Sequence, residues 1–388
     1  MSKRSLSRAL ILALGLPRVE LNRLLGTPPV TPKKVLIAAD VVLGDTIMLA
    51  PLLAKVRARW PTAEITLTCP PRFVALFEGR PWGVRAQALD LRDPQTLLAA
   101  RDTYDLALCP AQARHGWLAA ALGARWIIGF AGDPRWHKRI ALSQTRALPD
   151  RAMTFGDVAA TLVDGPEPPA YAPRQWPHPA VGPQDPTSTR VVLHLGASGV
   201  NKLWPAENWR ALIARLQGAG LAPCLVTGPG EAALLDEVDP ERRLTQHPGS
   251  LSLPEYWQLL AGSRALVCPD TGIAHLGRIV GTPTVALFGP GSPLLGGAGH
   301  FWRESPYVAI WNADVACRDQ HDFFERKVEW VRHCWRRPPE CANPHCVRQH
   351  TVDAVLAALQ TLAVMPQGTD SAAAASPQPS NRTPVSHD

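Results

Sequence analysis

The chain has 388 residues, of which 46% are hydrophobic and 19% charged, so it is long enough for two globular domains with a core in each. No apolar stretch reaches the roughly 18 residues that a membrane-spanning helix needs. The net charge of +7 favours anionic partners such as phosphates, nucleotides or acidic lipid surfaces. Because zinc-finger spacing and an RNA-binding aromatic motif are both missing, we expect no nucleic-acid partner.

The first 30 residues begin with a basic and apolar segment, MSKRSLSRALILALGLPR. No small-x-small cleavage site follows it, and Pro17 and Arg18 end the apolar run. We therefore expect a short helix, which either packs on the first domain or lies weakly on an anionic membrane surface. Without a signal peptide we expect a cytoplasmic protein with free thiols.

From residue 33, apolar runs with the length of buried strands alternate with segments of helical spacing. In residues 31–164 the expected strands are 34–38, 64–69, 105–109 and 126–130, and the expected helices are 46–60, 96–104 and 116–124. Such alternation is typical of a parallel sheet covered by helices on both faces. These residues are therefore predicted to form an α/β domain.

A proline-rich segment, residues 165–189, is predicted to be an extended linker, because proline fits poorly inside helices and sheets. The alternation then restarts in residues 190–350, with expected strands at 190–196, 222–228, 265–269 and 283–289 and expected helices at 205–220, 253–263 and 272–281. Residues 351–364 form a last expected helix. Residues 365–388 are rich in Ala, Ser and Pro, a composition that indicates disorder.

Three segments with polar residues follow expected strands, where ligands bind in open parallel sheets. In the first domain, Asp45 follows a buried strand and is either a helix cap or a base for proton transfer. In the second domain, Lys202 ends the loop GASGVNK and is either a solvated lysine or a cation that binds an oxyanion.

The third segment, PDTG, opens an expected helix with Asp270, Thr271 and Gly272. It is either a ligand-free N-cap or a phosphate site formed by backbone N–H groups and the helix dipole. On the first turns of that helix, His275 either packs or bonds a phosphate or a sugar hydroxyl.

A carboxylate from one domain, with a lysine and an anion-binding helix end from the other, suits transfer from a nucleotide-diphosphate donor. The chain has no G-x-G-x-x-G, no P-loop and no G-x-S-x-G, which disfavours a dehydrogenase, a P-loop NTPase and an α/β-hydrolase. It also has no D-x-D, so we expect no catalytic metal.

Three blocks resemble the core motifs of glycosyltransferase family 9, the family of the lipopolysaccharide heptosyltransferases: LGDTIMLAPLLAKVRARWP, HLGASGVNKLWPAENWRALIARL and CPDTGIAHLGRIVGTPTVALFGPGSP. The resemblance runs over roughly residues 33–362. It implies a GT-B fold, in which two Rossmann-like domains face each other across a cleft and the last helix returns to the first domain. It also implies inverting, metal-independent transfer from an ADP-activated heptose to a lipopolysaccharide-core or related glycan acceptor, without a cofactor.

By motif position, the resemblance makes Asp45 the base and Lys202 the residue that neutralises phosphate charge. It assigns donor binding to Ser198, Asp270, Thr271, Gly272 and His275, and places Gly44 and Thr46 on the acceptor side. A glycolipid acceptor would hold the enzyme at the inner face of the cytoplasmic membrane. Family members often carry a basic residue shortly before the Gly-Asp pair, where this chain has Ala39 and Asp40.

Two other functions remain open at this point. One is transfer of a different nucleotide-activated sugar, and the other is a GT-B-like binding or scaffold protein without transfer activity. Four late cysteines, Cys317, Cys334, Cys341 and Cys346, are also open to three interpretations: a structural zinc site, disulfides, or packed thiols. Their spacing disfavours zinc, since only the last two lie close together in the chain, although His345 could replace one ligand.

Overall fold

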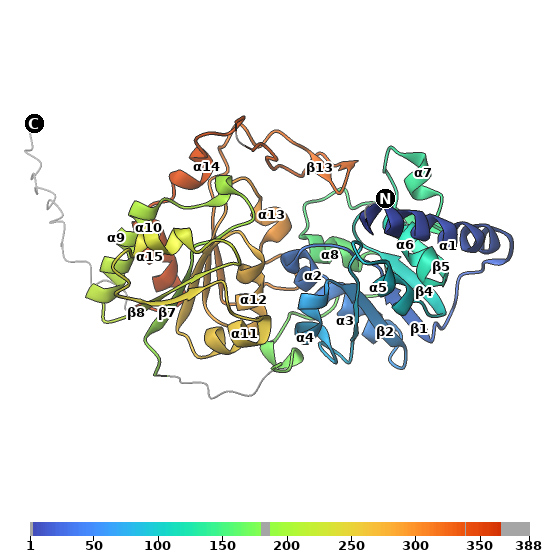
Figure 1. The fold of residues 1–388 in the computed structure, drawn as a ribbon, viewed down its shortest axis with the longest axis horizontal. Coiled ribbons are helices and arrows are strands. Elements are labelled where there is room, and N and C mark those ends of the chain that lie inside the picture. Colours follow the sequence, from blue (N-terminus) through green and yellow to red (C-terminus); the bar gives the residue numbers. More distant parts are fainter. Residues whose placement is uncertain (1–2, 180–186, 338, 366–388) are drawn as a thin grey trace, which may run out of the picture.

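The protein is described here by a computed structural model that covers residues 3–179, 187–337 and 339–365. Its two domains are each built on a six-stranded parallel sheet (Figure 1). The first sheet contains β1 (Lys34–Ile37), β2 (Glu64–Cys69), β3 (Arg85–Ala88), β4 (Tyr104–Cys109), β5 (Ala124–Phe130) and β6 (Gln144–Arg146). The second contains β7 (Arg190–His194), β8 (Ala222–Thr227), β9 (Thr245–Pro248), β10 (Ala265–Pro269), β11 (Thr284–Leu287) and β12 (Tyr307–Ile310).

Both sheets have the doubly wound strand order, β3-β2-β1-β4-β5-β6 in the first and β9-β8-β7-β10-β11-β12 in the second. The order reverses between β1 and β4 and again between β7 and β10. Such a reversal opens a crevice at the carboxyl ends of the two central strands, where ligands bind in this class of sheet. The segments singled out in the sequence follow β1, β7 and β10, so all three begin at a reversal point.

Helices cover both faces of each sheet. Those of the first domain are α1 (Lys3–Leu25), α2 (Leu43–Met48), α3 (Ala50–Arg59), α4 (Val74–Phe77), α5 (Pro94–Ala99), α6 (His115–Leu122), α7 (Trp136–Arg139) and α8 (Phe155–Ala160). Those of the second are α9 (Ala206–Gly218), α10 (Ala233–Val238), α11 (Leu253–Ala261), α12 (Gly272–Val280), α13 (Pro293–Gly296), α14 (His345–Arg348) and α15 (Val352–Thr361). Short 3-10 turns lie at Pro71–Phe73, Pro173–Gln175 and Val200–Lys202.

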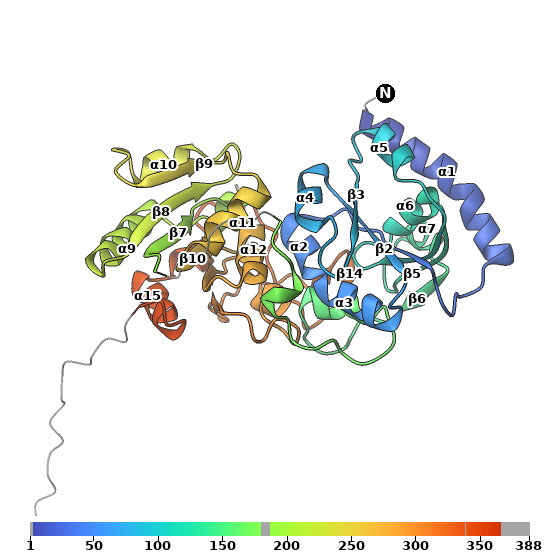
Figure 2. The same cartoon turned by 90° about the horizontal axis from the view of Figure 1, so that it is seen from below.

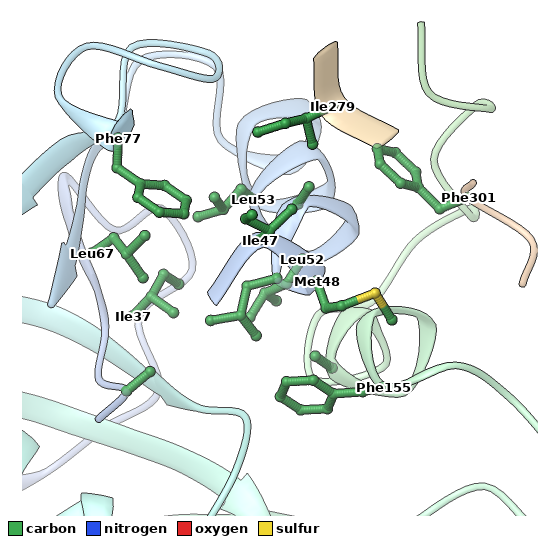
Figure 3. Close-up of a cluster of buried hydrophobic side chains, with 14 of the residues drawn as sticks. Ile37, Ile47, Met48, Leu52, Leu53, Leu67, Phe77, Phe155, Ile279 and Phe301 are labelled. Atoms are coloured by element: carbon green, nitrogen blue, oxygen red, sulfur yellow. The ribbon is translucent and has the colours of Figure 1, made fainter. Parts of the chain in front are cut away.

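The inner sides of the two domains share one hydrophobic core (Figure 3). Ile37 and Ile47 of the first domain belong to the same buried cluster as Ile279 and Phe301 of the second. The outer face of each sheet has a separate cluster of its own. Because apolar burial is the main favourable term in folding, the shared cluster holds the domains together as well as stabilising each one.

The first turns of α2 and α12 meet at the centre of the junction (Figures 1 and 2). A Cβ atom on Gly44 would lie 2.8 Å from Cδ2 of His275, and a Cβ on Gly272 would lie 3.0 Å from Cβ of Leu43. Glycine at these two positions therefore lets the two helix starts approach each other closely.

The proline-rich linker packs against both domains over its described residues. Tyr171 donates from its hydroxyl to the carbonyl of Ile279 in the second domain (2.7 Å), and the indole of Trp176 donates to the carbonyl of Leu76 in the first (3.2 Å). Both aromatic side chains are buried. Residues 180–186 of the predicted linker lie outside the described part of the chain.

A second connection, residues 318–333, leaves the second domain, contacts the first and returns; we call it the strap (Figure 1). It holds a short hairpin of β13 (Asp322–Phe323) and β14 (Arg326–Lys327). The buried guanidinium of Arg326 donates to the backbone carbonyls of three first-domain residues: Ala111 (2.8 Å), Phe130 (3.1 Å) and Ala131 (2.9 Å). Lys138 and Arg135 of α7 form ion pairs with Glu325 at the turn of the hairpin.

The strap, and not the last helix, returns to the first domain. We expected the last helix to cross back, but α15 packs on α9, β11 and β12 of the second domain. Its buried Val355 and Leu359 join the cluster on the outer face of the second sheet, which covers their apolar side completely. Figure 2 shows α15 on the side of the second domain that faces away from the first.

The close approach of α2 and α12 makes Gly44→Ala destabilising. The added methyl group would meet the His275 ring, and overpacking of this kind costs about 1–3 kcal/mol. Gly218→Ala in α9 is the matched control, since nothing lies within 4 Å of its added Cβ. That change should raise stability by about 0.5–1 kcal/mol, because alanine is the better helix former. Denaturant unfolding measures both, and equal effects of the two substitutions would contradict the tight contact.

Candidate active site at the domain junction

Asp45 lies in the first turn of α2, half-buried beside the start of α12. The N-cap of α2 is Val42, and no described hydrogen bond involves the Asp45 carboxylate. The interpretation of Asp45 as a helix cap is therefore wrong. Burial raises the pKa of this carboxyl to about 6, with a further rise from the charge of Asp270 and an opposing effect of Lys202. These influences place Asp45 within electrostatic reach of both second-domain residues.

Lys202 and Asp270 form an ion pair across the reversal point of the second sheet. The Nζ of Lys202 donates to the Asp270 carboxylate (3.0 Å) and to the Asp270 backbone carbonyl (3.0 Å). Both side chains are partly buried, with 24% and 17% exposure. An ammonium group has three N–H donors, so one remains for an incoming anion.

The other predicted donor-side residues have different surroundings. Thr271 is the N-cap of α12, where its Oγ1 accepts from the N–H of Ile273 (3.3 Å). The neighbouring Gly272 contacts the first turn of α2, as described above. Ser198 lies exposed in the loop after β7. On the acceptor side, the Thr46 hydroxyl donates to the carbonyl of Val42 (2.9 Å) within α2.

His275 is buried between α12 and α2 and lies near two cations. Burial, and then the charges of Arg278 and Lys202, hold the pKa of its imidazole well below the usual range. A neutral ring accepts or donates a hydrogen bond but carries no charge that could neutralise a phosphate. Its position against Gly44 makes it part of the domain contact.

Two residues near the site were missed by the sequence reasoning. Arg278, fully buried, donates to the carbonyl of Gly297 (3.1 Å), and its guanidinium lies 4.0 Å from the centre of the Tyr307 ring. Glu231 follows β8, accepts from the N–H of Gly228 (2.8 Å), and would contact any Cβ added at Gly196. An acidic residue after the second strand of a Rossmann unit is a sequence signal for ribose binding that could have indicated Glu231.

The late cysteines do not form a metal site. All eight cysteines are free thiols, and within the described residues no group of three or more Cys, His, Asp or Glu side chains could hold a metal ion. Arg336 donates to the carbonyl of Cys317 (2.7 Å) and approaches the Sγ of Cys334 (3.7 Å), where the strap starts and ends. Of the three interpretations, packed thiols fit Cys334 and Cys346, which are buried, whereas Cys317 is exposed and Cys341 half-buried.

Asp45→Asn should stabilise the fold at neutral pH. Because the pKa of Asp45 is raised in the folded state, the folded protein holds this proton more tightly than the unfolded chain does. Stability therefore decreases as pH rises from about 4 to about 6 and is constant above. The substitution removes this loss, so the melting temperature of the variant should exceed that of wild type at pH 7 and match it near pH 4. A gain that is the same at both values would show that burial does not perturb this carboxyl.

The chain was compared with known proteins. The family model for glycosyltransferase family 9 (heptosyltransferase) matches residues 98–317, more than half of the chain. Lipopolysaccharide heptosyltransferase 1 of Pseudomonas aeruginosa is 28% identical over 212 residues, which cover 50% of this chain and 57% of that protein. The Salmonella typhimurium protein of the same name is 36% identical over 111 residues, 28% of this chain and 35% of that one. The matches thus span little more than half of the first relative and about a third of the second.

Among solved structures, the E. coli heptosyltransferase WaaC with ADP superposes with a TM-score of 0.64 at 18% identity. The match covers 85% of this chain and 99% of that one, and it shows a common GT-B fold of two Rossmann-like domains. The family model, which matches more than half of the chain, decides the family. The chain belongs to glycosyltransferase family 9, the heptosyltransferase family.

Proposed function

We propose that this protein is an inverting glycosyltransferase that moves a heptose from ADP-heptose to a hydroxyl of a lipopolysaccharide-core or related glycan acceptor. The observation that carries the proposal is the meeting of Asp45, Lys202 and the start of α12 at the junction of the two domains. A base on one side and cationic groups on the other fit the two charges that develop during glycosyl transfer.

In this mechanism, the acceptor hydroxyl gives its proton to the Asp45 carboxylate as its oxygen bonds to the anomeric carbon of the donor. The bond from that carbon to the phosphate oxygen breaks on the opposite face, which inverts the configuration. A pKa near 6 suits Asp45 to this task, because the carboxylate is ionised at pH 7 and yet more basic than an ordinary aspartate.

The leaving diphosphate gains negative charge as that bond breaks. The free N–H of Lys202, the Thr271 hydroxyl hydrogen and the backbone N–H groups at the start of α12 supply donors for it. Glu231, beyond the ends of β7 and β8, has a carboxylate suited to the diol of a ribose. The general base Asp45, the phosphate contacts of Lys202 and α12, and the ribose contact of Glu231 then follow one another along the carboxyl edges of the two sheets.

Two other functions remain compatible with the same fold: transfer of another nucleotide-activated sugar, and binding without transfer activity. A donor screen separates them from the proposal. ADP-heptose and other nucleotide sugars are each supplied with a core glycan, and both nucleotide release and product are measured, with and without EDTA. We expect transfer from ADP-heptose that is insensitive to EDTA. A strict need for Mg²⁺, or binding without any turnover, would contradict the proposal.

Asp45→Asn tests the base. Loss of a general base typically lowers turnover by about 10²–10⁴-fold, and donor binding should persist because the phosphate contacts remain. Asp40→Asn is the matched control, since it removes the same charge from the same connection, and neither Lys202 nor Asp270 affects the pKa of Asp40. The wild-type rate should fall as pH drops below about 6, when Asp45 takes up a proton. A pH-independent rate or near-normal turnover of Asp45→Asn would remove Asp45 from the reaction.

Lys202→Ala tests the phosphate contact. We expect ADP affinity to fall by about tenfold or more and to depend less on salt, because a cation is removed from the anion site. Lys327→Ala, an exposed lysine of the strap, is the control. The loss could also arise from the Asp270 carboxylate that the substitution leaves unpaired. The double variant Lys202→Ala/Asp270→Asn decides this point: full recovery of affinity would mean that Lys202 only neutralises Asp270.

A further inference from the structure

Helix α1 is attached to the first domain by one side only. Its buried residues are Ser7, Gly15, Val19 and Asn22. Gly15 lets the helix approach α6, since a Cβ there would lie 3.2 Å from the Trp117 ring, and Asn22 donates to the carbonyl of Ala124 (3.0 Å). In both overall views, α1 lies along the end of the molecule farthest from the second domain (Figures 1 and 2).

The opposite side of α1 is apolar and exposed. Five leucines along it are between 44% and 80% exposed: Leu6, Leu12, Leu16, Leu21 and Leu24. At 100° per residue, Ala9 and Ala13 lie within the same solvent-facing arc, and both are exposed. Glu20 and Arg23 fall in the same arc, so the uncharged apolar face covers residues 6–17 of the helix. An exposed apolar face of this kind is uncommon on a soluble monomer and marks an interaction surface.

The charges of the first turns are positive, and Lys3 and Arg8 flank this face. Lys3, Arg4, Arg8 and Arg18 belong to the helix, and residues 1–19 contain no Asp or Glu. Glu20, the first acid, forms an ion pair with Arg23 (3.1 Å). A second copy of this chain would bring the same positive charges to the contact, whereas anionic lipid headgroups would neutralise them.

A neighbouring aromatic residue extends the surface. Trp136 at the start of α7 is 66% exposed. The following residue, His137, accepts a hydrogen bond from the Trp117 indole under α1 (2.8 Å), which links α7 to the helix. Tryptophan with basic neighbours is typical of segments at the membrane–water interface.

We infer that the exposed face of α1, with Trp136 beside it, binds the surface of an anionic lipid bilayer. The helix lies in the headgroup region with its leucines toward the acyl chains and Lys3, Arg4 and Arg8 at the phosphates. No described helix is long and apolar enough to pass through a bilayer, so the attachment is peripheral.

The start of α1 is close to the carboxyl edge of the first sheet. Burial raises the pKa of Asp40, which follows β1, and the charges of Arg114 and Arg4 oppose that rise. Arg4 is thus within electrostatic reach of the connection that carries Asp45. Binding through α1 would place that edge near the headgroup layer, where a lipid-linked acceptor presents its sugars.

The test is co-sedimentation of the full chain with vesicles of phosphatidylcholine containing about 30% phosphatidylglycerol, compared with pure phosphatidylcholine. Point variants are preferable to deletion of the helix, because deletion would uncover Trp117 and its core. Leu6→Gln/Leu16→Gln/Leu24→Gln should weaken binding at least tenfold, and Lys3→Gln/Arg4→Gln/Arg8→Gln should weaken it several-fold per charge at low salt. Val200→Gln/Leu294→Gln changes exposed apolar residues of the second domain and should bind as wild type does.

Three results would overturn the inference. The first is no binding of wild type to anionic vesicles, and the second is unchanged binding of the leucine variant. The third is a wild-type dimer in solution that the leucine variant converts to monomers, which would make this face a contact between copies. Melting temperatures equal to wild type show that the variants are folded. The assay contains no sugar donor, so its outcome is independent of the proposed transfer activity.

Discussion

The contact between Gly44 and Gly272 determines where every candidate group of the site lies. Two helices can begin this close together only when neither first turn carries a side chain at the point of contact. The contact brings together two positive helix ends, an unfavourable arrangement by itself. A carboxylate stands beside each of them, Asp45 in the first turn of α2 and Asp270 just before α12, and Lys202 compensates for the resulting negative charge.

The raised pKa of Asp45 depends on both domains together. Burial raises its pKa, and the second domain supplies the Asp270 charge that disfavours ionisation and the Lys202 charge that favours it. Movement of Lys202 toward a bound phosphate would alter this balance and make the carboxyl more basic. In the proposed reaction, donor binding and the strength of the base would be coupled in this way through one ion pair.

The sequence predicted the central strands well and the sheet edges poorly. Central strands are covered on both faces and read as apolar runs, so 64–69 and 265–269 were predicted with the observed bounds. In the two six-stranded sheets, the four strands without a prediction are the outermost ones, β3, β6, β9 and β12. They are short and half-exposed, with sequences RAQA, QTR, TQHP and YVAI that carry little pattern. The predicted helix 46–60 is divided into α2 and α3 because Pro51 cannot continue a helix.

The sequence also named most residues at the junction, but it could not show how they pair. Asp270 was expected on the donor-binding side, and the structure adds its ion pair with Lys202, which depends on the folding of the loop after β7 against β10. Arg278 and Arg326 have no motif, because their partners are backbone carbonyls of distant segments. The path of the chain after β12 was likewise unpredictable. Only tertiary packing decides that the strap contacts the first domain and that the last helix packs on the second.

The two connections have a mechanical consequence. The linker and the strap cross the junction on opposite sides of the α2–α12 contact (Figures 1 and 2). Opening about a hinge would require one side of the junction to be free of connections. Here, rotation about the strap would strain the hydrogen bond of Tyr171 in the linker, and rotation about the linker would strain those of Arg326 in the strap. Separation of the two halves would therefore have to stretch or break one of these sets of hydrogen bonds, whereas small sliding displacements would keep both. For the transfer proposed above, the same bonds would keep Asp45 close to Lys202 and the start of α12.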